Sequence, residues 1–243
     1  MNGAAIELDD ATVRRGSTLA VDGVSFRVNR GDWFGLIGAN GSGKTSLLRA
    51  LAGRLPGQFG ACRIDDQELR EQPERRARLV GFMPPADLLP GILTCRQVFE
   101  LVQSDGRKRE AALDPIAEAI GIPLLLDRRI GDCSAGMKQR VAIGCAFAAG
   151  NSIVILDEPF NWLDPVAALD LRATLRECVN RGMTIITALH DMITLAACDR
   201  GVLLGEGKIV AELEADEVRE GRENPFAFES RLIDVLRHHS LFT

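Results

Sequence analysis

The stretch G-A-N-G-S-G-K-T, at residues 38–45, decides the fold of this chain. It matches the phosphate-binding template G-x-x-x-x-G-K-[S/T] at every fixed position. Residues 33–37 before it form an apolar run that is typical of a buried strand, and residues 46–52 after it have the pattern of a helix. Because strand, glycine-rich loop and helix follow one another, the stretch predicts a loop that binds phosphate groups.

The residue types in this loop suit a triphosphate. Glycines let the backbone curl tightly, so that successive N–H groups point at phosphate oxygens. The helix that begins here adds the positive end of its dipole. Lys44 is placed to reach the β- and γ-phosphates, and Thr45 offers a hydroxyl to Mg²⁺. We therefore expect nucleotide contacts at Gly38, Ala39, Asn40, Gly41, Ser42, Gly43, Lys44, Thr45 and Ser46.

Composition narrows the class of protein. The chain has 243 residues, 46% of them apolar, which is enough for one large α/β domain or a domain with a subdomain. The net charge of -5 gives no general basic character, so we expect no nucleic-acid partner. A basic cluster at residues 75–78 is interpreted as the solvated face of a helix. The six cysteines are scattered and form no C-x-x-C pair, which favours reduced, partly buried thiols in a cytoplasmic protein.

The sequence predicts neither a signal peptide nor a membrane-spanning helix. The first residues lack a basic segment followed by an apolar one. No apolar run approaches the roughly 18 residues that a spanning helix needs. If the protein acts at a membrane, we expect another chain to cross it.

The order of the remaining elements predicts the fold class. Strands are expected at residues 6–13, 21–28, 32–37, 62–65, 79–83, 152–156 and 184–189, with a hairpin at 200–213. Helices are expected at residues 94–102, 108–120, 135–150 and 165–181, and after 213. This order indicates an α/β fold: a P-loop NTPase core with a mostly parallel sheet, an N-terminal antiparallel β-subdomain and a helical subdomain insert. We expect a single domain over residues 1–243, with the helical subdomain at about 86–150 and C-terminal helices at about 214–243.

A second cluster of chemistry-bearing residues follows a buried strand. The apolar residues 153–156 run directly into Asp157 and Glu158. The carboxyl ends of parallel strands share one edge of a sheet, where ligands bind, and the phosphate loop lies at the same edge. Asp157 is therefore predicted to hold Mg²⁺, and Glu158 to polarise a water molecule for attack on the γ-phosphate.

These motifs resemble those of the ATP-binding cassette (ABC) ATPases, the nucleotide-binding subunits of ABC transporters. Residues 133–140, C-S-A-G-M-K-Q-R, are similar to the family signature L-S-G-G-Q or its variant L-S-G-G-M-K-Q-R, and Ser134 lies 23 residues before Asp157, as in the family. Residues 161–164 resemble the D-loop. His190 resembles the switch histidine that follows the next strand.

The resemblance implies a dimer in which two cassettes close around two ATP molecules. Each ATP would lie between the P-loop of one subunit and the signature of the other, gripped there by Ser134, Ala135 and Gly136. Glu158 and His190 would be the catalytic residues, and Mg²⁺ would lie at Thr45 and Asp157. The implied partners are a transmembrane subunit and a second cassette, identical or different, at the cytoplasmic face of a membrane. The M-K-Q-R variant resembles export cassettes and favours export.

Several positions depart from the family pattern: Cys133 replaces the signature leucine, Gly144-Cys145 replaces Ala-Arg, and three others bear on the chemistry. Arg15 stands where the family has an aromatic residue that stacks on adenine, and a guanidinium plane is able to stack there too. Pro85 replaces a glutamine that binds Mg²⁺ or positions water, and proline offers neither an amide side chain nor an N–H. Ala135 replaces the first signature glycine and adds a Cβ where the γ-phosphate approaches. These departures leave open two alternatives: a soluble cassette that does not serve transport, and a weakly hydrolysing partner of an active cassette.

Overall fold

The computed structural model describes residues 3–102 and 116–240. The strands are β1 (Ala4–Arg15), β2 (Thr18–Asn29), β3 (Trp33–Ile37), β4 (Ala61–Ile64), β5 (Gln67–Glu68), β6 (Val80–Phe82), β7 (Ile153–Asp157), β8 (Thr184–Leu189), β9 (Arg200–Gly205) and β10 (Lys208–Leu213). The helices are α1 (Lys44–Leu51), α2 (Pro73–Leu79), α3 (Cys95–Val102), α5 (Ile116–Ala119), α6 (Ala135–Ala148), α7 (Pro165–Asn180), α8 (Met192–Ala197), α9 (Ala215–Glu223) and α10 (Pro225–Ser240). Most of the helix expected at 108–120 lies outside the described residues, which include its last part as α5.

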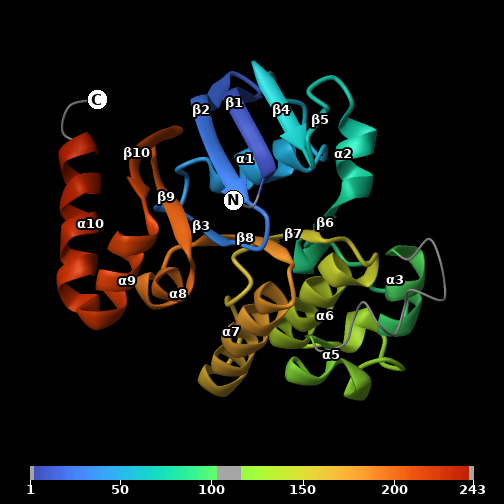
Figure 1. Cartoon of the computed structure of the whole chain (residues 1–243). Coiled ribbons are helices and arrows are strands. Elements are labelled where there is room, and N and C mark those ends of the chain that lie inside the picture. The colour runs from blue at the N-terminus through green and yellow to red at the C-terminus, as the bar shows by residue number, and fades with distance from the viewer. Residues whose placement is uncertain (1–2, 103–115, 241–243) are drawn as a thin grey trace.

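Two sheets form the framework of the molecule (Figure 1). The central sheet has the strand order β10-β9-β3-β8-β7-β6; its strands run parallel except for the antiparallel edge strand β10. The smaller sheet, in the order β2-β1-β4-β5, is antiparallel. The α/β fold with a mostly parallel sheet and an N-terminal antiparallel β-subdomain is therefore confirmed.

Both faces of the central sheet are buried, which explains its unbroken apolar strands. In β7, Ile153 and Ile155 join a core shared with α1 and the antiparallel sheet, whereas Val154 and Leu156 join a core shared with α6 and α7. Figure 1 shows the same layering, with the antiparallel sheet and α1 on one side of the central sheet and α6 and α7 on the other. Two independent cores thus fix the position of the strand that carries the acidic pair.

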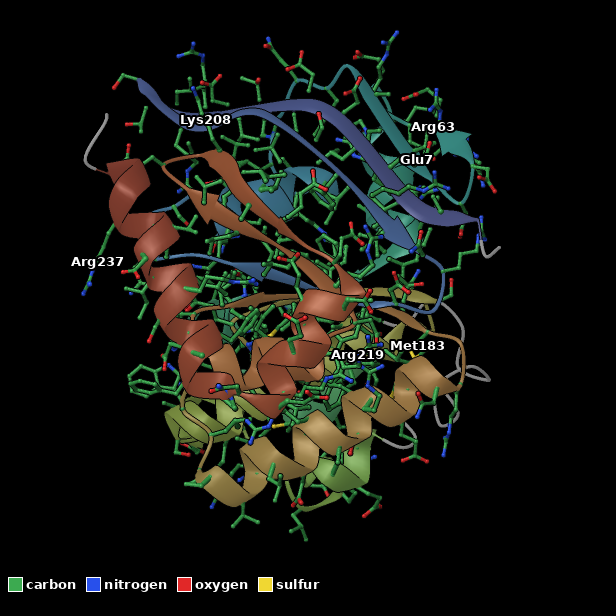
Figure 2. All side chains as sticks on the ribbon, turned by 60° about the vertical axis from the view of Figure 1, so that its left-hand side comes forward. Glu7, Arg63, Met183, Lys208, Arg219 and Arg237 are labelled. Carbon is green, nitrogen blue, oxygen red and sulfur yellow. The ribbon has the colours of Figure 1, made fainter. Side chains whose placement is uncertain are left out.

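The antiparallel sheet has one buried and one solvated face. On its inner side the Phe26 ring stacks on Phe34 of β3 at a centroid distance of 5.4 Å, which ties the two sheets together. On its outer side Glu7 forms ion pairs with Arg27 at 3.5 Å and Arg63 at 3.2 Å, and Figure 2 shows Glu7 beside Arg63 on this face. The buried inner face and the solvated outer face match the alternating apolar and polar residues of β1 and β2.

The insert is helical, as the sequence predicts. The described residues between 86 and 132 form α3, α5 and the short 3-10 turns η1 (Ala86–Leu88), η2 (Ile122–Leu124) and η3 (Ile130–Asp132), and no strand. Thr94 caps α3 with a reciprocal pair of hydrogen bonds: Gln97 N–H donates to Thr94 Oγ1 at 3.3 Å, and Thr94 N–H donates to Gln97 Oε1 at 2.9 Å.

The basic cluster at residues 75–78 corrects one prediction, because Arg76 is buried. Its guanidinium donates to the main-chain oxygens of Leu69 at 2.6 Å and Ala50 at 3.3 Å, and lies 4.9 Å from the centroid of the Phe59 ring. Interpreting this whole cluster as solvated is therefore wrong. Arg76 faces inward because its side chain reaches main-chain oxygens of α1 and of residues 69–70, contacts that a charge run cannot reveal.

The prediction of reduced, unpaired thiols is confirmed. All six cysteines are free and buried. Within residues 3–102 and 116–240, no helix is both long enough and apolar enough to cross a membrane.

Candidate nucleotide site

The phosphate loop connects the end of β3 to the start of α1, and its glycines are fixed by close contacts. A Cβ on Gly43, whose φ is +103°, would lie 2.2 Å from the oxygen of Ala20. A Cβ on Gly38 would lie 2.3 Å from the oxygen of Leu204. A larger residue at either position would force the loop apart. The loop encloses a cavity of about 230 Å³ lined by Ala20, Asn40, Gly41, Ser42, Gly43, Lys44, Thr45, Ser46 and Glu158.

Lys44 occupies the centre of this loop. Its ammonium is buried and donates hydrogen bonds to the main-chain oxygens of Gly38 at 2.7 Å and Ala39 at 3.1 Å. It also lies 3.5 Å from Oε1 of Glu158. Ser42 Oγ is buried in the same loop and, among the described residues, has no hydrogen-bond partner. A buried cation beside an unpaired hydroxyl is the environment that an entering phosphate group would complete.

Thr45 and Asp157 meet across the edge of the sheet. Thr45 Oγ1 donates to Asp157 Oδ1 at 3.1 Å. Burial raises the pKa of Asp157, and the hydrogen bond from Thr45 opposes that shift. A hydroxyl and a carboxylate are hard oxygen ligands of the kind that Mg²⁺ prefers. No group of three or more His, Cys, Asp or Glu side chains in the described ranges is arranged to hold a metal ion, so Mg²⁺ bound here would also need phosphate oxygens.

Glu158 follows β7 in an unusual backbone conformation, with φ at +52°. Its N–H donates to the oxygen of Ala188 at 3.2 Å, which holds it against the end of β8. Its Oε2 accepts a hydrogen bond from Nδ2 of Asn161 at 2.8 Å and lies 4.0 Å from Nδ1 of His190. The structure thus brings Lys44, Glu158 and His190 into one cluster at the carboxyl edge of the sheet.

The residues that resemble the signature begin α6. Ser134 is the N-cap, and its Oγ accepts a hydrogen bond from the N–H of Met137 at 3.3 Å. Ser134 and Ala135 are exposed. A Cβ on Gly136 would lie 2.7 Å from the oxygen of Trp162, so this glycine is needed for close packing. None of these residues lines the phosphate-loop cavity of the same chain.

A larger cavity of about 640 Å³ lies between the phosphate loop, the end of β6 and α6. Pro85 lines it together with Asp157 and Glu158. The proline therefore lies near the acidic pair. The other lining residues are Thr45, Arg49, Met83, Pro84, Ala86, Asp87, Ala135, Lys138, Gln139, Asn161 and Trp162.

Arg15 ends β1 and is exposed. It does not line the phosphate-loop cavity, whereas Ala20 of β2 does. A contact between Arg15 and adenine stays a prediction.

Sequence reasoning placed Gln139 in the signature and Asn161 in the D-loop, but it missed that both contact Glu158. Gln139 Nε2, buried in α6, donates to the main-chain oxygen of Glu158 at 3.0 Å, and Asn161 holds its carboxylate. Asn161 lies three residues after Glu158, a spacing that could have suggested a local side-chain contact. Gln139 lies in the signature-like residues 133–140, but its contact with Glu158 joins two different elements and has no local signal.

The phosphate loop after β3 and the acidic pair after β7 define a nucleotide-binding protein of the P-loop class. The sequence model described as "ABC transporter" matches residues 21–161, more than half of the chain. The chain belongs to this family, as an ATP-binding subunit.

Individual relatives support this assignment. The chain is 32% identical to the energy-coupling factor transporter ATP-binding protein EcfA1 of Bacillus subtilis over 237 residues, covering 91% of this chain and 84% of that protein. It is 31% identical to the Nod factor export ATP-binding protein I of Burkholderia thailandensis over 220 residues, covering 87% and 71%. A solved structure described as the ATP-binding subunit of an ABC transporter superposes with a TM-score of 0.82 at 28% identity, covering 96% of this chain and 99% of that one.

Proposed function

We propose that this chain hydrolyses ATP to ADP and phosphate and thereby powers the export of a substrate through a separate membrane subunit. The observation that carries the proposal is the convergence of Lys44, Thr45, Asp157 and Glu158 at one edge of the sheet. Phosphoryl transfer to water requires a cation for the phosphates, ligands for Mg²⁺ and a carboxylate that can polarise water. Lys44 is the buried cation, Thr45 and Asp157 are the candidate Mg²⁺ ligands, and Glu158 is the carboxylate, with His190 beside it.

Each group has a distinct role in the proposed reaction. Lys44 and the loop N–H groups, from residues 38–46, bind the β- and γ-phosphates. Thr45 and Asp157 hold Mg²⁺, which when bound neutralises charge on the phosphates. Glu158 accepts a hydrogen bond from the attacking water and polarises it, and His190 contacts the γ-phosphate. Release of Lys44 from its loop carbonyls accompanies phosphate entry.

The proposed assembly is a dimer of cassettes on a membrane subunit, at the cytoplasmic face. Exposed Ser134 and Ala135 support a role in gripping the nucleotide of a second cassette, identical or different, together with Gly136. The helical subdomain would face the membrane subunit, because several large apolar side chains are exposed there. These side chains are Leu88, Ile92, Leu101 and Leu124. We treat residues 1–243 as one ATPase domain.

Export is the proposed direction. It is supported by the similarity of residues 137–140 to export cassettes and by the relative named for Nod factor export. The energy-coupling factor relative carries no such direction in its name. Uptake of substrate into inside-out vesicles that contain the membrane subunit, driven by external ATP, would support export; uptake into right-side-out vesicles loaded with ATP would reverse it.

The variant Glu158→Gln tests the proposed hydrolysis. Glutamine keeps the size and the hydrogen bonding of the side chain but removes its charge. We expect ATP to bind, turnover to fall by about 100-fold or more, and an ATP-bound dimer to accumulate in size-exclusion chromatography. Turnover equal to that of the wild type would exclude Glu158 as the base.

A second candidate function is that of a weakly hydrolysing partner for an active cassette. It is favoured by Pro85, which lines the cavity beside Glu158 without a side-chain donor or acceptor, and by Ala135. Turnover by the wild-type chain no higher than that of Glu158→Gln, restored on mixing with an active cassette, would favour this candidate.

A further inference from the structure

Two cysteine thiols face one another in the helical subdomain, where α3 packs against α6 (Figure 1). Sγ of Cys95, the first residue of α3, lies 4.0 Å from Sγ of Cys133. Both thiols are free. Cys133 directly precedes Ser134, the N-cap of α6. The thiol pair therefore connects α3 to the residue beside the one proposed to grip nucleotide.

The main chains that carry the two thiols are already in contact. Cys95 N–H donates to the oxygen of Arg128 at 2.9 Å. Ile130 N–H donates to the oxygen of Leu93, also at 2.9 Å. The turn η3 then brings the chain back, with Cys133 N–H donating to the oxygen of Ile130 at 3.1 Å. Since a disulfide holds its sulfurs about 2.05 Å apart, the two sulfurs need to approach by only about 2 Å.

The two thiols differ in their access to solvent. Cys95 is 0% exposed, whereas Cys133 is 7% exposed and its neighbour Ser134 lies at the surface. Burial, together with the nearby Cys133, raises the pKa of Cys95 to about 12, so the Cys95 thiol stays protonated near neutral pH. A soluble oxidant therefore reaches Cys133 first, and Cys95 is placed to attack the oxidised sulfur.

We propose that Cys95 and Cys133 form a disulfide when the chain meets hydrogen peroxide, and that this bond slows ATP hydrolysis by displacing Ser134. The thiolate of Cys133 attacks one peroxide oxygen, which gives a sulfenic acid and a hydroxide ion that takes up a proton. The thiol of Cys95 then loses its proton, and its sulfur displaces a second hydroxide from Cys133. The two thiols together lose two electrons, and one peroxide molecule gains them and becomes two water molecules.

The disulfide would act on Ser134 through the main chain. Drawing Cys133 toward α3 moves the residue before the N-cap, whose Oγ accepts the N–H of Met137 at 3.3 Å. A misplacement of about 1 Å can lower a rate about 100-fold. This effect on turnover rests on the proposed function, whereas formation of the bond does not. Neither cysteine lines the phosphate-loop cavity, so the disulfide leaves that part of the site intact.

The first experiment looks for the bond in the full, nucleotide-free chain. The protein is treated with hydrogen peroxide, its remaining thiols are blocked with N-ethylmaleimide, and it is digested with trypsin. Cleavage after lysine and arginine places Cys95 in the peptide 79–96 and Cys133 in the peptide 130–138. We expect mass spectrometry to find these two peptides joined, and dithiothreitol to separate them.

Variants identify the two partners. Cys133→Ala and Cys95→Ala should each abolish the joined peptides, whereas Cys145→Ala, which removes another buried thiol from α6, should leave them joined. Circular dichroism verifies that each variant is folded, and the wild-type result does not depend on the variants. The proposal is overturned if peroxide leaves both thiols open to N-ethylmaleimide, if it oxidises Cys133 to a sulfinic acid with Cys95 still free, or if it joins a different pair.

The second experiment measures turnover before and after peroxide treatment. We expect kcat of the wild type to fall by about 10-fold or more and to return with dithiothreitol, while the Kd for a fluorescent ATP analogue stays within about 2-fold. Cys133→Ala should keep whatever kcat it has before treatment. A joined chain with unchanged kcat would overturn the proposed effect. If the untreated wild type has no turnover, the proposed function itself fails, although the peptides would still be joined.

Discussion

The ammonium of Lys44 lies 3.5 Å from Oε1 of Glu158 while it donates to two carbonyl oxygens of its own loop. The cation proposed to bind phosphate is therefore satisfied by contacts within the chain. In the proposed mechanism, nucleotide binding would exchange these contacts for phosphate oxygens and would free one oxygen of Glu158 to face water. The proposed roles of Lys44 in binding phosphate and of Glu158 in polarising water are therefore coupled through one ion pair, and both side chains line the same cavity.

Lys44→Ala should weaken ATP binding by at least about 1.5–3 kcal/mol, because it removes a charge-assisted contact from a site with little water. Isothermal titration with ATP measures the effect. Lys208→Ala serves as the control, since Lys208, labelled in Figure 2, is exposed, pairs with Asp22 at 3.2 Å and does not line the phosphate-loop cavity. Equal titration curves for the Lys44 variant and the wild type would contradict the assignment.

Asp157→Asn should raise the Tm of the nucleotide-free protein and reduce the further rise in Tm that MgATP causes. Burial raises the pKa of Asp157. At pH values between the unfolded and the folded pKa, the folded chain therefore still holds a proton that the unfolded chain has released. Stability from this group is present below the unfolded pKa, near 4, and is lost as pH rises through the folded pKa. The Tm advantage of the variant should therefore be small below about pH 4 and larger at pH 7.

With MgATP bound, we expect the wild type to gain more stability than Asp157→Asn. A bound cation favours the ionised carboxylate, so MgATP should raise the Tm of the wild type more than that of Asp157→Asn at pH 7. An equal rise in both would show that Asp157 is not a ligand.

Arg76→Ala should lower the free energy of unfolding by about 3 kcal/mol or more, because it leaves buried carbonyl oxygens without a donor and a cavity beside Phe59. Burial also lowers the pKa of the guanidinium. Arg78→Ala, two residues away and exposed, should change stability by less than about 0.5 kcal/mol. Urea unfolding measures both changes in the free energy of unfolding. Equal losses for the two variants would contradict the assignment of a stabilising role to the burial of Arg76.

Much of the fold could be predicted because the deciding signals are local. The strand that ends in Asp157 is an unbroken apolar run, and the phosphate loop is a fixed motif between a strand and a helix. The same signals predicted which edge of the sheet would carry Thr45 and Asp157, and the structure brings these two side chains to hydrogen-bonding distance there.

The rest depended on contacts between elements that are distant along the chain. The burial of Arg76 follows from its hydrogen bonds to α1 and to residues 69–70, and the bond from Gln139 to Glu158 follows from the packing of α6 against β7. Charge and hydropathy patterns describe one element at a time, so they could not distinguish a buried arginine from a solvated one. Nor could they show that Glu158 adopts a left-handed backbone conformation, which depends on the surrounding structure rather than on residue type.

Pro85→Gln should raise ATP turnover. Pro85 is the N-cap residue of η1, with φ at -59°, and lines the same cavity as Asp157 and Glu158. Glutamine there would supply an amide able to hold water or Mg²⁺ and would remove the fixed φ of proline. Nucleotide affinity should change little, because Lys44 and the loop N–H groups remain.

Two measurements make this prediction decisive. Pro90→Gln, at an exposed site that does not line the cavity, controls for the roughly 0.4–1 kcal/mol that loss of a proline costs through the unfolded chain. Turnover is then compared per folded molecule, with the folded fraction taken from circular dichroism. An increase in turnover for Pro85→Gln but not for Pro90→Gln would show that Pro85 limits hydrolysis in the wild-type chain. If turnover is unchanged or lower, another group already positions the water, and Asn161, which lines the same cavity, is the first to substitute next.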